Sequence, residues 1–215
     1  MSYQCDIKIM CVPKRMLNVA RLCGKLGLTI LDAVIDHKQE GNPFNTSRRA
    51  FSEPIEEGVT HRCVLQDDVD VCDGFNDMIQ ELVNRYPDAI WSLYSRKRES
   101  TDIQEGSIVS TGGRIWGPGV IIPVKYLYSI YEKYDSGYEG YIHDDGFYCG
   151  WAKWKKIPTL TTYPCAVRLM EDDSLLDHTL KFDNNSFGEI GSMSLIDHTD
   201  LSLDWPCNCF LKFNV

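Results

Sequence analysis

Short apolar runs alternate with helix-spaced apolar repeats along the first half of the chain. The run at residues 5–12 is typical of a buried strand, and the apolar positions within residues 16–23 recur at helical spacing until Gly27 ends the pattern. A second apolar run covers residues 29–35 and stops at Asp36. These patterns predict a strand, a helix and a second apolar segment in that order.

The alternation continues toward the middle of the chain. A short helix is expected near residues 47–51, a strand at 61–65, a helix with one apolar face at 75–86 and another strand at 89–94. The polar stretch that follows, to about residue 107, is predicted to be a loop.

Strands that alternate with helices predict a mostly parallel sheet with helices on both faces. The second half of the chain adds a stretch rich in glycine and aromatic residues and a helix at 124–134. No linker rich in Pro, Gly or Ser divides the two halves. We therefore expect an α/β fold of the Rossmann-like type, built as one domain over residues 1–215.

Three carboxylates follow the strand predicted at 61–65. Asp67, Asp68 and Asp70 lie within four positions, and ligands of parallel sheets bind beyond the carboxyl ends of the strands. Side chains two positions apart on a strand point the same way, so Asp68 and Asp70 could converge on one cation, Mn²⁺ or Mg²⁺. The alternative is a solvated turn that leads into a helix capped by Asp73.

A second acidic pair, Asp144 and Asp145, directly precedes an aromatic segment that contains Phe147, Tyr148 and Trp151. A carboxylate in a partly apolar pocket can have a raised pKa and serve as a general base. Asp-Asp-Gly is also a common turn sequence, so a plain turn is the alternative.

Glycines and a histidine supply the remaining candidates. Gly112, Gly113, Gly117 and Gly119 either form tight turns or let the backbone approach a sugar or an acceptor closely. His178 follows both acidic motifs and is a candidate nitrogen ligand for the metal, with a surface or core role as the alternative.

Charge and cysteine content narrow the function classes. The chain has 22 basic and 31 acidic side chains, and the formal net charge of −9 disfavours loose binding to nucleic acid. No apolar run approaches the roughly 20 residues that cross a bilayer, so a cytoplasmic protein without membrane insertion is expected. The nine cysteines are odd in number and scattered, and we expect them to be reduced. The candidate contacts to phosphate are Arg48, Arg49, Arg96 and Arg98.

Three segments, taken in order, resemble the GT-A glycosyltransferases, especially small bacterial and phage forms near the lipooligosaccharide galactosyltransferase family. VLQDDV at 64–69 resembles the strand-ending Leu-Glu-Asp-Asp form of the family's DxD motif. STGGRIWGPG at 110–119 resembles its glycine loop, and HDDGFYCGW at 143–151 resembles its Glu-Asp motif with the helix that follows.

The resemblance implies a metal-dependent transfer of a sugar from a nucleotide-sugar donor, expected to be a UDP-sugar, to an acceptor hydroxyl. Asp68 would be the main metal ligand, Asp67 would support the ribose or the metal, and Asp145 would activate the acceptor, with Asp144 in the preceding acidic position. The resemblance leaves open whether the configuration at the anomeric carbon of the sugar is inverted or retained.

The resemblance also assigns regions of the chain. Residues 1–107 would form the nucleotide-sugar-binding half and residues 108–215 the acceptor-binding half. The residues that would contact the donor are Pro13, Arg15, Asp36, Gly112 and Gly113.

Two positions depart from the family pattern. Gln66 replaces the usual Glu, and Leu169 stands where a metal-binding His is expected, which leaves His178 as its substitute. These departures keep open a non-catalytic nucleotide- or glycan-binding module of the same fold, and a nucleotidyltransferase is a further alternative. The acceptor is expected to be a hydroxymethylated DNA base, a glycan or a protein, in the host cytoplasm if the chain is phage-encoded.

Overall fold

The computed structural model describes residues 3–37, 43–94, 107–111, 114–135, 144–163 and 165–170. The elements up to residue 94 are β1 (Cys5–Cys11), the 3₁₀ turn η1 (Pro13–Arg15), α1 (Met16–Leu26), η2 (Ile30–Asp32), β2 (Ala33–Ile35), α2 (Pro43–Ser52), β3 (His61–Gln66), β4 (Val69–Val71), α3 (Phe75–Arg85) and β5 (Ile90–Ser92). The later elements are β6 (Ser107–Ser110), β7 (Gly119–Pro123), α4 (Val124–Asp135), α5 (Asp144–Lys155), β8 (Thr159–Tyr163) and β9 (Val167–Leu169).

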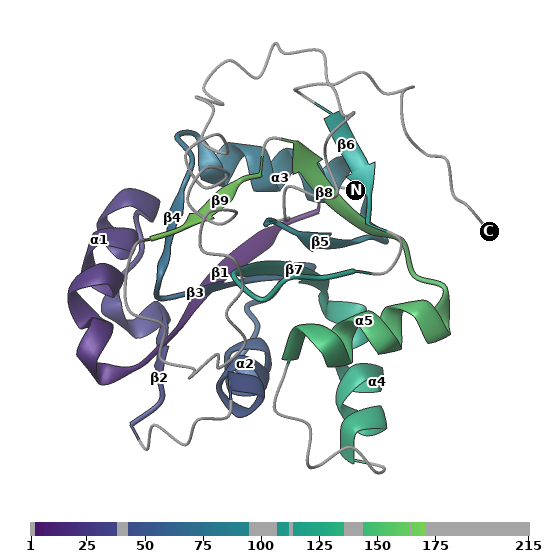
Figure 1. Ribbon diagram of the computed structural model, residues 1–215, viewed down its shortest axis with the longest axis horizontal. Helices are drawn as coiled ribbons and strands as arrows, with labels where there is room; N and C mark the ends of the chain where they lie inside the picture. The colour runs from purple at the N-terminus through teal and green to yellow at the C-terminus, as the bar shows by residue number, and fades with distance from the viewer. Residues whose placement is uncertain are drawn as a thin grey trace, which may run out of the picture.

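Seven strands form one sheet in the order β2-β1-β3-β7-β5-β8-β6 (Figure 1). β1 is parallel to β2 and β3, and β5 is parallel to β8. β7 runs antiparallel to both β3 and β5, and β6 runs antiparallel to β8. The predicted α/β class and the predominance of one strand direction are confirmed, whereas the reversed strand in the middle of the sheet was not expected.

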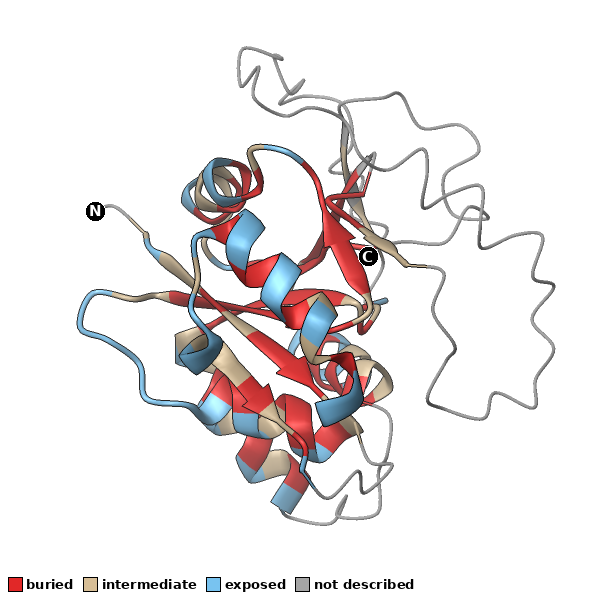
Figure 2. Ribbon diagram, turned by 90° about the vertical axis from the view of Figure 1, so that its left-hand side faces the viewer, coloured by how far each residue is buried: buried red, intermediate tan, exposed pale blue. Residues whose placement is uncertain are grey.

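Helices cover both faces of this sheet. α1 and α3 pack on one face, over a core that includes Leu65 and Trp91, while α2, α4 and α5 pack on the other, over Val64 and Ile122. Neighbouring residues such as Val64 and Leu65 serve opposite cores because side chains alternate across a strand. Figure 1 shows α2, α4 and α5 gathered on one side, and Figure 2 shows the central strands buried and the outer helix faces exposed.

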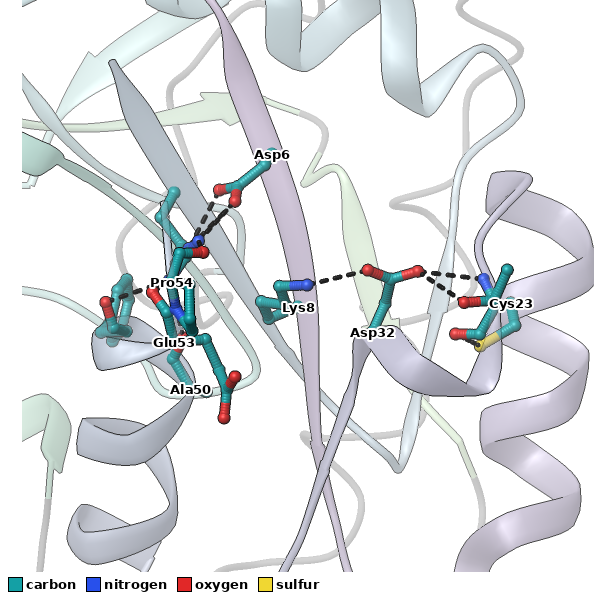
Figure 3. Close-up of polar contacts among 10 residues, drawn as sticks. Asp6, Lys8, Cys23, Asp32, Ala50, Glu53 and Pro54 are labelled. Atoms are coloured by element: carbon teal, nitrogen blue, oxygen red, sulfur yellow. Dashed lines mark hydrogen bonds and ion pairs between the residues drawn. The ribbon is translucent and has the colours of Figure 1, made fainter. Parts of the chain in front are cut away.

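Arg62 of β3 is fully buried and links α2 to the sheet through hydrogen bonds and an ion pair. Its Nη2 lies 2.6 Å from Oδ2 of Asp6 on β1 (Figure 3). Two positions along β1, Lys8 reaches Asp32 at 2.8 Å. The guanidinium of Arg62 lies at the carboxyl end of α2, where the helix dipole favours a cation. The contacts of Arg62 therefore stabilise this end of α2. The carbonyl oxygens that accept from Arg62 belong to Ala50, Phe51, Glu53 and Pro54.

The predicted end of α1 is confirmed, one predicted cap is corrected, and α2 begins at Pro43, before the expected 47. α1 ends at Gly27, which has a φ of 69° that glycine adopts without strain. α3 is preceded by Gly74 rather than capped by the side chain of Asp73 as the turn alternative required. The cysteines within the described ranges are free, as predicted. None of the helices in those ranges is long and apolar enough to span a bilayer.

Candidate functional site

The carboxyl ends of β1, β2 and β3 lie side by side at one edge of the sheet. The parallel register places Cys11 opposite Ile35 and Met10 opposite Gln66. Asp36, just beyond β2, is buried, and its amide donates to the carbonyl of Cys11 at 2.8 Å. This edge is where ligands of such sheets bind, and it collects five of the predicted site residues: Pro13, Arg15, Asp36, Asp67 and Asp68.

Arg15 bridges Asp67 and Asp68, which we call the acidic pair. Its Nη1 lies 3.0 Å from Oδ1 of Asp67 and 2.9 Å from Oδ2 of Asp68. The second oxygen of Asp67 accepts the amide of Val12 at 2.8 Å. Since η1 begins at the exposed Pro13 and ends at Arg15, the turn after β1 delivers a buried cation to the carboxylates that follow β3.

Asp68 keeps one carboxylate oxygen without a partner. Its Oδ1 is buried and has no hydrogen bond within the part of the chain that the structure describes. Burial raises the pKa of Asp68, although the charge of Arg15 works against that rise. A buried, unpaired oxygen of a carboxylate is a feature that suits a divalent cation.

Asp70 is directed to a different set of partners. The chain turns after β3, and Asp70 lies in β4, which pairs with β9 in a separate two-stranded sheet. Burial would raise the pKa of Asp70, but nearby cations outweigh this and lower it. The structure does not bring Asp68 and Asp70 together, and the described residues contain no group of three or more metal-binding side chains. The partners of Asp70 are Arg21 at 3.2 Å, Lys25 at 3.4 Å and Arg168 at 3.1 Å.

Gly117 lies between the side chain of Gln66 and the second acidic motif. It precedes β7, whose antiparallel pairing sets Gly119 opposite Leu65 of β3. A Cβ atom on Gly117 would lie 2.9 Å from Nε2 of Gln66 and 3.5 Å from Oδ1 of Asp144. The residue that directly precedes the acidic pair and the buried carboxylate therefore contact the same glycine, although they are far apart in the sequence.

Asp144 is the first residue of α5 and is buried, with 5% of its surface exposed. Its Oδ1 accepts the amide of Asp145 at 2.9 Å, and the hydroxyl of Ser47 also hydrogen-bonds to its carboxylate. Burial, together with the negative charge of Asp145, raises the pKa of Asp144 to about 7. No basic side chain is among the groups that set this pKa, so Asp144 can change its protonation state near neutral pH.

Several predicted residues lie elsewhere. Gly112, Gly113 and His178 fall outside the described residues, as do Arg96 and Arg98. Arg48 pairs with Asp135 at 2.7 Å, and Arg49 donates to the carbonyl of Ile35 at 2.9 Å. These two arginines therefore already have partners within the protein. Leu169 lies in β9 opposite Val69, and the following amide, of Met170, donates to the carbonyl of Asp68 at 2.8 Å.

Ser47 was not identified from the sequence, although a signal was present. It lies on α2 three positions after Phe44 and four before Phe51, which are both buried. A small polar residue within the apolar stripe of a helix needs a buried hydrogen-bond partner, and here the partners are the hydroxyl of Tyr148, at 2.9 Å, and Asp144.

Comparison of the sequence with protein-family models and with curated proteins finds no match. The functional interpretation therefore depends on the chemistry of this site.

Proposed function

We propose that this protein transfers a sugar from a nucleotide-sugar donor to an acceptor hydroxyl. The observation that carries the proposal is the meeting at Gly117 of Gln66, next to the acidic pair, and the buried Asp144. Sugar transfer requires charge complementarity to the leaving nucleoside diphosphate and a group that takes the acceptor's proton. The acidic pair, which follows Gln66 in the chain, and Asp144 have the properties that suit these two tasks.

On the donor side, Arg15 is the group suited to the diphosphate. A guanidinium presents several N–H donors in a plane that matches phosphate oxygens. Arg15 lies beside Val12 and the acidic pair at the edge where nucleotides bind in such sheets. Asp36, at the end of the next strand, is the candidate contact to the ribose or the base.

A Mn²⁺ or Mg²⁺ ion fits these residues only in part. The unpaired Oδ1 of Asp68 suits such an ion, whereas both oxygens of Asp67 are bonded and Asp70 is held by basic side chains. A bound ion supplies positive charge that stabilises a leaving diphosphate. Asp68 is thus the described residue that would hold it, and the ion would compete with Arg15 for this carboxylate.

On the acceptor side, the structure favours Asp144 as the proton acceptor. The resemblance gives that role to Asp145, but a base works best when its pKa lies near the operating pH, and the pKa of Asp144 is about 7. Asp145, half-buried and adjacent, would then orient the acceptor.

Donor hydrolysis tests the proposal directly. Wild-type protein and the variants Asp68→Ala, Asp144→Asn and Asp145→Asn are compared across a panel of nucleotide sugars, with Mn²⁺ or with a chelator. The expected result is hydrolysis of one donor, lost in Asp68→Ala, with transfer reduced more by Asp144→Asn than by Asp145→Asn. Asp73→Asn is the matched control, because this carboxylate lies close to the acidic pair in the chain, after β4, and is largely exposed.

A binding module without turnover is the second candidate. It is favoured by Arg15, which already neutralises much of the charge of the acidic pair. Nucleotide binding detected by thermal shift, with no hydrolysis or transfer of any donor in the panel, would replace the first proposal with this one.

A further inference from the structure

Three hydroxyl groups from three helices form a buried line that ends at Asp144. The line, which we call the hydroxyl chain, consists of Tyr131 on α4, Tyr148 on α5 and Ser47 on α2. The hydroxyls of Tyr131 and Tyr148 lie 3.5 Å apart, and those of Tyr148 and Ser47 lie 2.9 Å apart. Ser47 in turn hydrogen-bonds to the carboxylate of Asp144. Tyr148 is fully buried and Ser47 is 1% exposed.

The chemistry of the end group fixes the direction of these hydrogen bonds. An ionised carboxylate only accepts, and a serine hydroxyl has a single hydrogen to donate. When Asp144 is ionised, Ser47 must therefore donate to it and accept from Tyr148, which can accept from Tyr131. Burial raises the pKa of both tyrosines, so their hydroxyls keep the hydrogens that this arrangement needs.

The same three hydroxyls also fit the protonated form of Asp144. A protonated carboxyl can donate to Ser47, and each hydroxyl can then rotate and donate toward Tyr131 instead of toward Asp144. In both directions, the links between Asp144, Ser47 and Tyr148 keep a donor and an acceptor. A buried polar atom without a partner would be costly, and the hydroxyl chain avoids that cost at the start and at the end of a proton transfer.

We propose that the hydroxyl chain is a reversible hydrogen-bond relay that positions the carboxylate of Asp144 and allows it to gain and lose a proton inside the protein. Ser47 and Tyr148 are thus positioning residues that act through Asp144. The inference rests on the proposed function only for its consequence in catalysis, because the contacts belong to the folded chain whatever its substrate.

The charged groups around the hydroxyl chain act on it from several sides. Asp145, on the same helix as Asp144, opposes ionisation of Asp144. Arg48 of α2 lies over the ring of Tyr131, at 5.3 Å from its centroid, and Arg62 of β3 adds a second positive charge that acts on this tyrosine. The position of Ser47 is itself fixed, since Arg62 holds the end of α2.

The test measures the pKa of Asp144 directly, by the carboxyl carbon chemical shift during an NMR titration, with Asp144→Asn used for assignment. Ser47→Ala removes the donor to the ionised carboxylate, so the pKa of Asp144 should rise, by about half to one pH unit for one such hydrogen bond. Tyr148→Phe keeps the ring and removes one hydroxyl, and a smaller rise is expected. Tyr126→Phe is the matched control, because this hydroxyl of α4 bonds to the carbonyl of Asp88 instead.

The outcomes separate this inference from the proposed function. Unchanged titration of Asp144 in both Ser47→Ala and Tyr148→Phe, in folded proteins, would overturn the relay. A raised pKa without any donor hydrolysis by the wild type would support the relay and reject the glycosyltransferase. If both the relay and the proposed sugar transfer are correct, the acid limb of the pH profile of kcat should move to higher pH in Ser47→Ala by the same amount as the pKa of Asp144. Ser47→Thr, which keeps a hydroxyl, should move this limb less.

Discussion

The acidic pair, of which Asp67 is buried and Asp68 partly exposed, and the buried Asp144 are held by different kinds of partner. The acidic pair is held by the guanidinium of Arg15, at 3.0 Å and 2.9 Å. Asp144 is held by a hydroxyl and a backbone amide, and its pKa is about 7. The difference shows that burial alone does not determine the charge of a carboxylate, because the chemistry of its partners decides how much of the desolvation cost is offset.

This contrast matches a division of labour. An ion pair offsets part of the cost of burying negative charge, which suits a site that binds. A carboxylate among neutral partners changes its charge near neutral pH, which suits a site that exchanges protons.

The largest effect is expected from Arg15→Ala, which removes the cation from the acidic pair. Breaking a buried ion pair leaves uncompensated charge and typically costs about 3 to 5 kcal/mol. The free energy of unfolding, measured by urea denaturation at pH 7, should fall by that order. Lys14→Ala changes an exposed neighbour and should leave it nearly unchanged. An equally small loss in Arg15→Ala would mean that the acidic pair does not depend on its cation.

Asp144→Asn should raise the free energy of unfolding, whereas Arg15→Ala lowers it. The native pKa of about 7 lies above that of an unfolded aspartate, so the stability that Asp144 contributes is present at low pH and is lost as the pH rises through 7. The variant should therefore match the wild type near pH 4 and exceed it at pH 8, by at most about 4 kcal/mol. Unfolding experiments at the two pH values measure the difference, and a gain independent of pH would argue against a raised pKa.

Asp70→Asn tests whether the third carboxylate belongs to the acidic pair or to the scaffold. Its partners are Arg21, Lys25 and Arg168, so we expect a loss of about 2 kcal/mol in stability with donor hydrolysis retained. Because its native pKa is lowered, the loss should be present at neutral pH and disappear in acid. If the Asp70→Asn variant is stable but no longer hydrolyses the donor, Asp70 acts in the functional site together with the acidic pair.

The smallest change in stability is expected from Gly117→Ala, which crowds the side chains of Gln66 and Asp144. The added Cβ meets the end of a flexible side chain at 2.9 Å, so the cost should be about 1 kcal/mol, but Gln66 must move and transfer should fall. Gly150→Ala, on α5 with open space around it, is the control and should preserve transfer.

The sequence predicted what depends on local periodicity. The strands at 61–65 and 89–94 and the helices at 16–23 and 75–86 are present close to their expected positions, because apolar spacing reports which face is buried. The convergence of Asp68 and Asp70 assumed one continuous strand, and the chain instead turns between them. Strand direction has no such periodic signal, which is why the reversed β7 was not foreseen.

The site depended still more on contacts between distant segments. Asp144 was recognised as a candidate, but the approach of Asp144 and Gln66 to Gly117 joins residues that no local pattern connects. Ser47 and Arg15 acquire their partners only when α2 and the turn after β1 are placed against other elements. Sequence reasoning therefore found the reactive groups and could not find what controls their charge.

The central position of β7 also has a consequence for synthesis of the chain. β3 pairs on one side with β1 and on the other with β7, whose residue Gly119 meets Leu65. While the ribosome has made only the first 107 residues, the inner edge of β3 has no partner, and β5 has none on that side either. Unpaired strand edges invite association with other chains, so a nascent chain arrested before residue 119 should aggregate or recruit chaperones, and release of the next few residues should end that exposure.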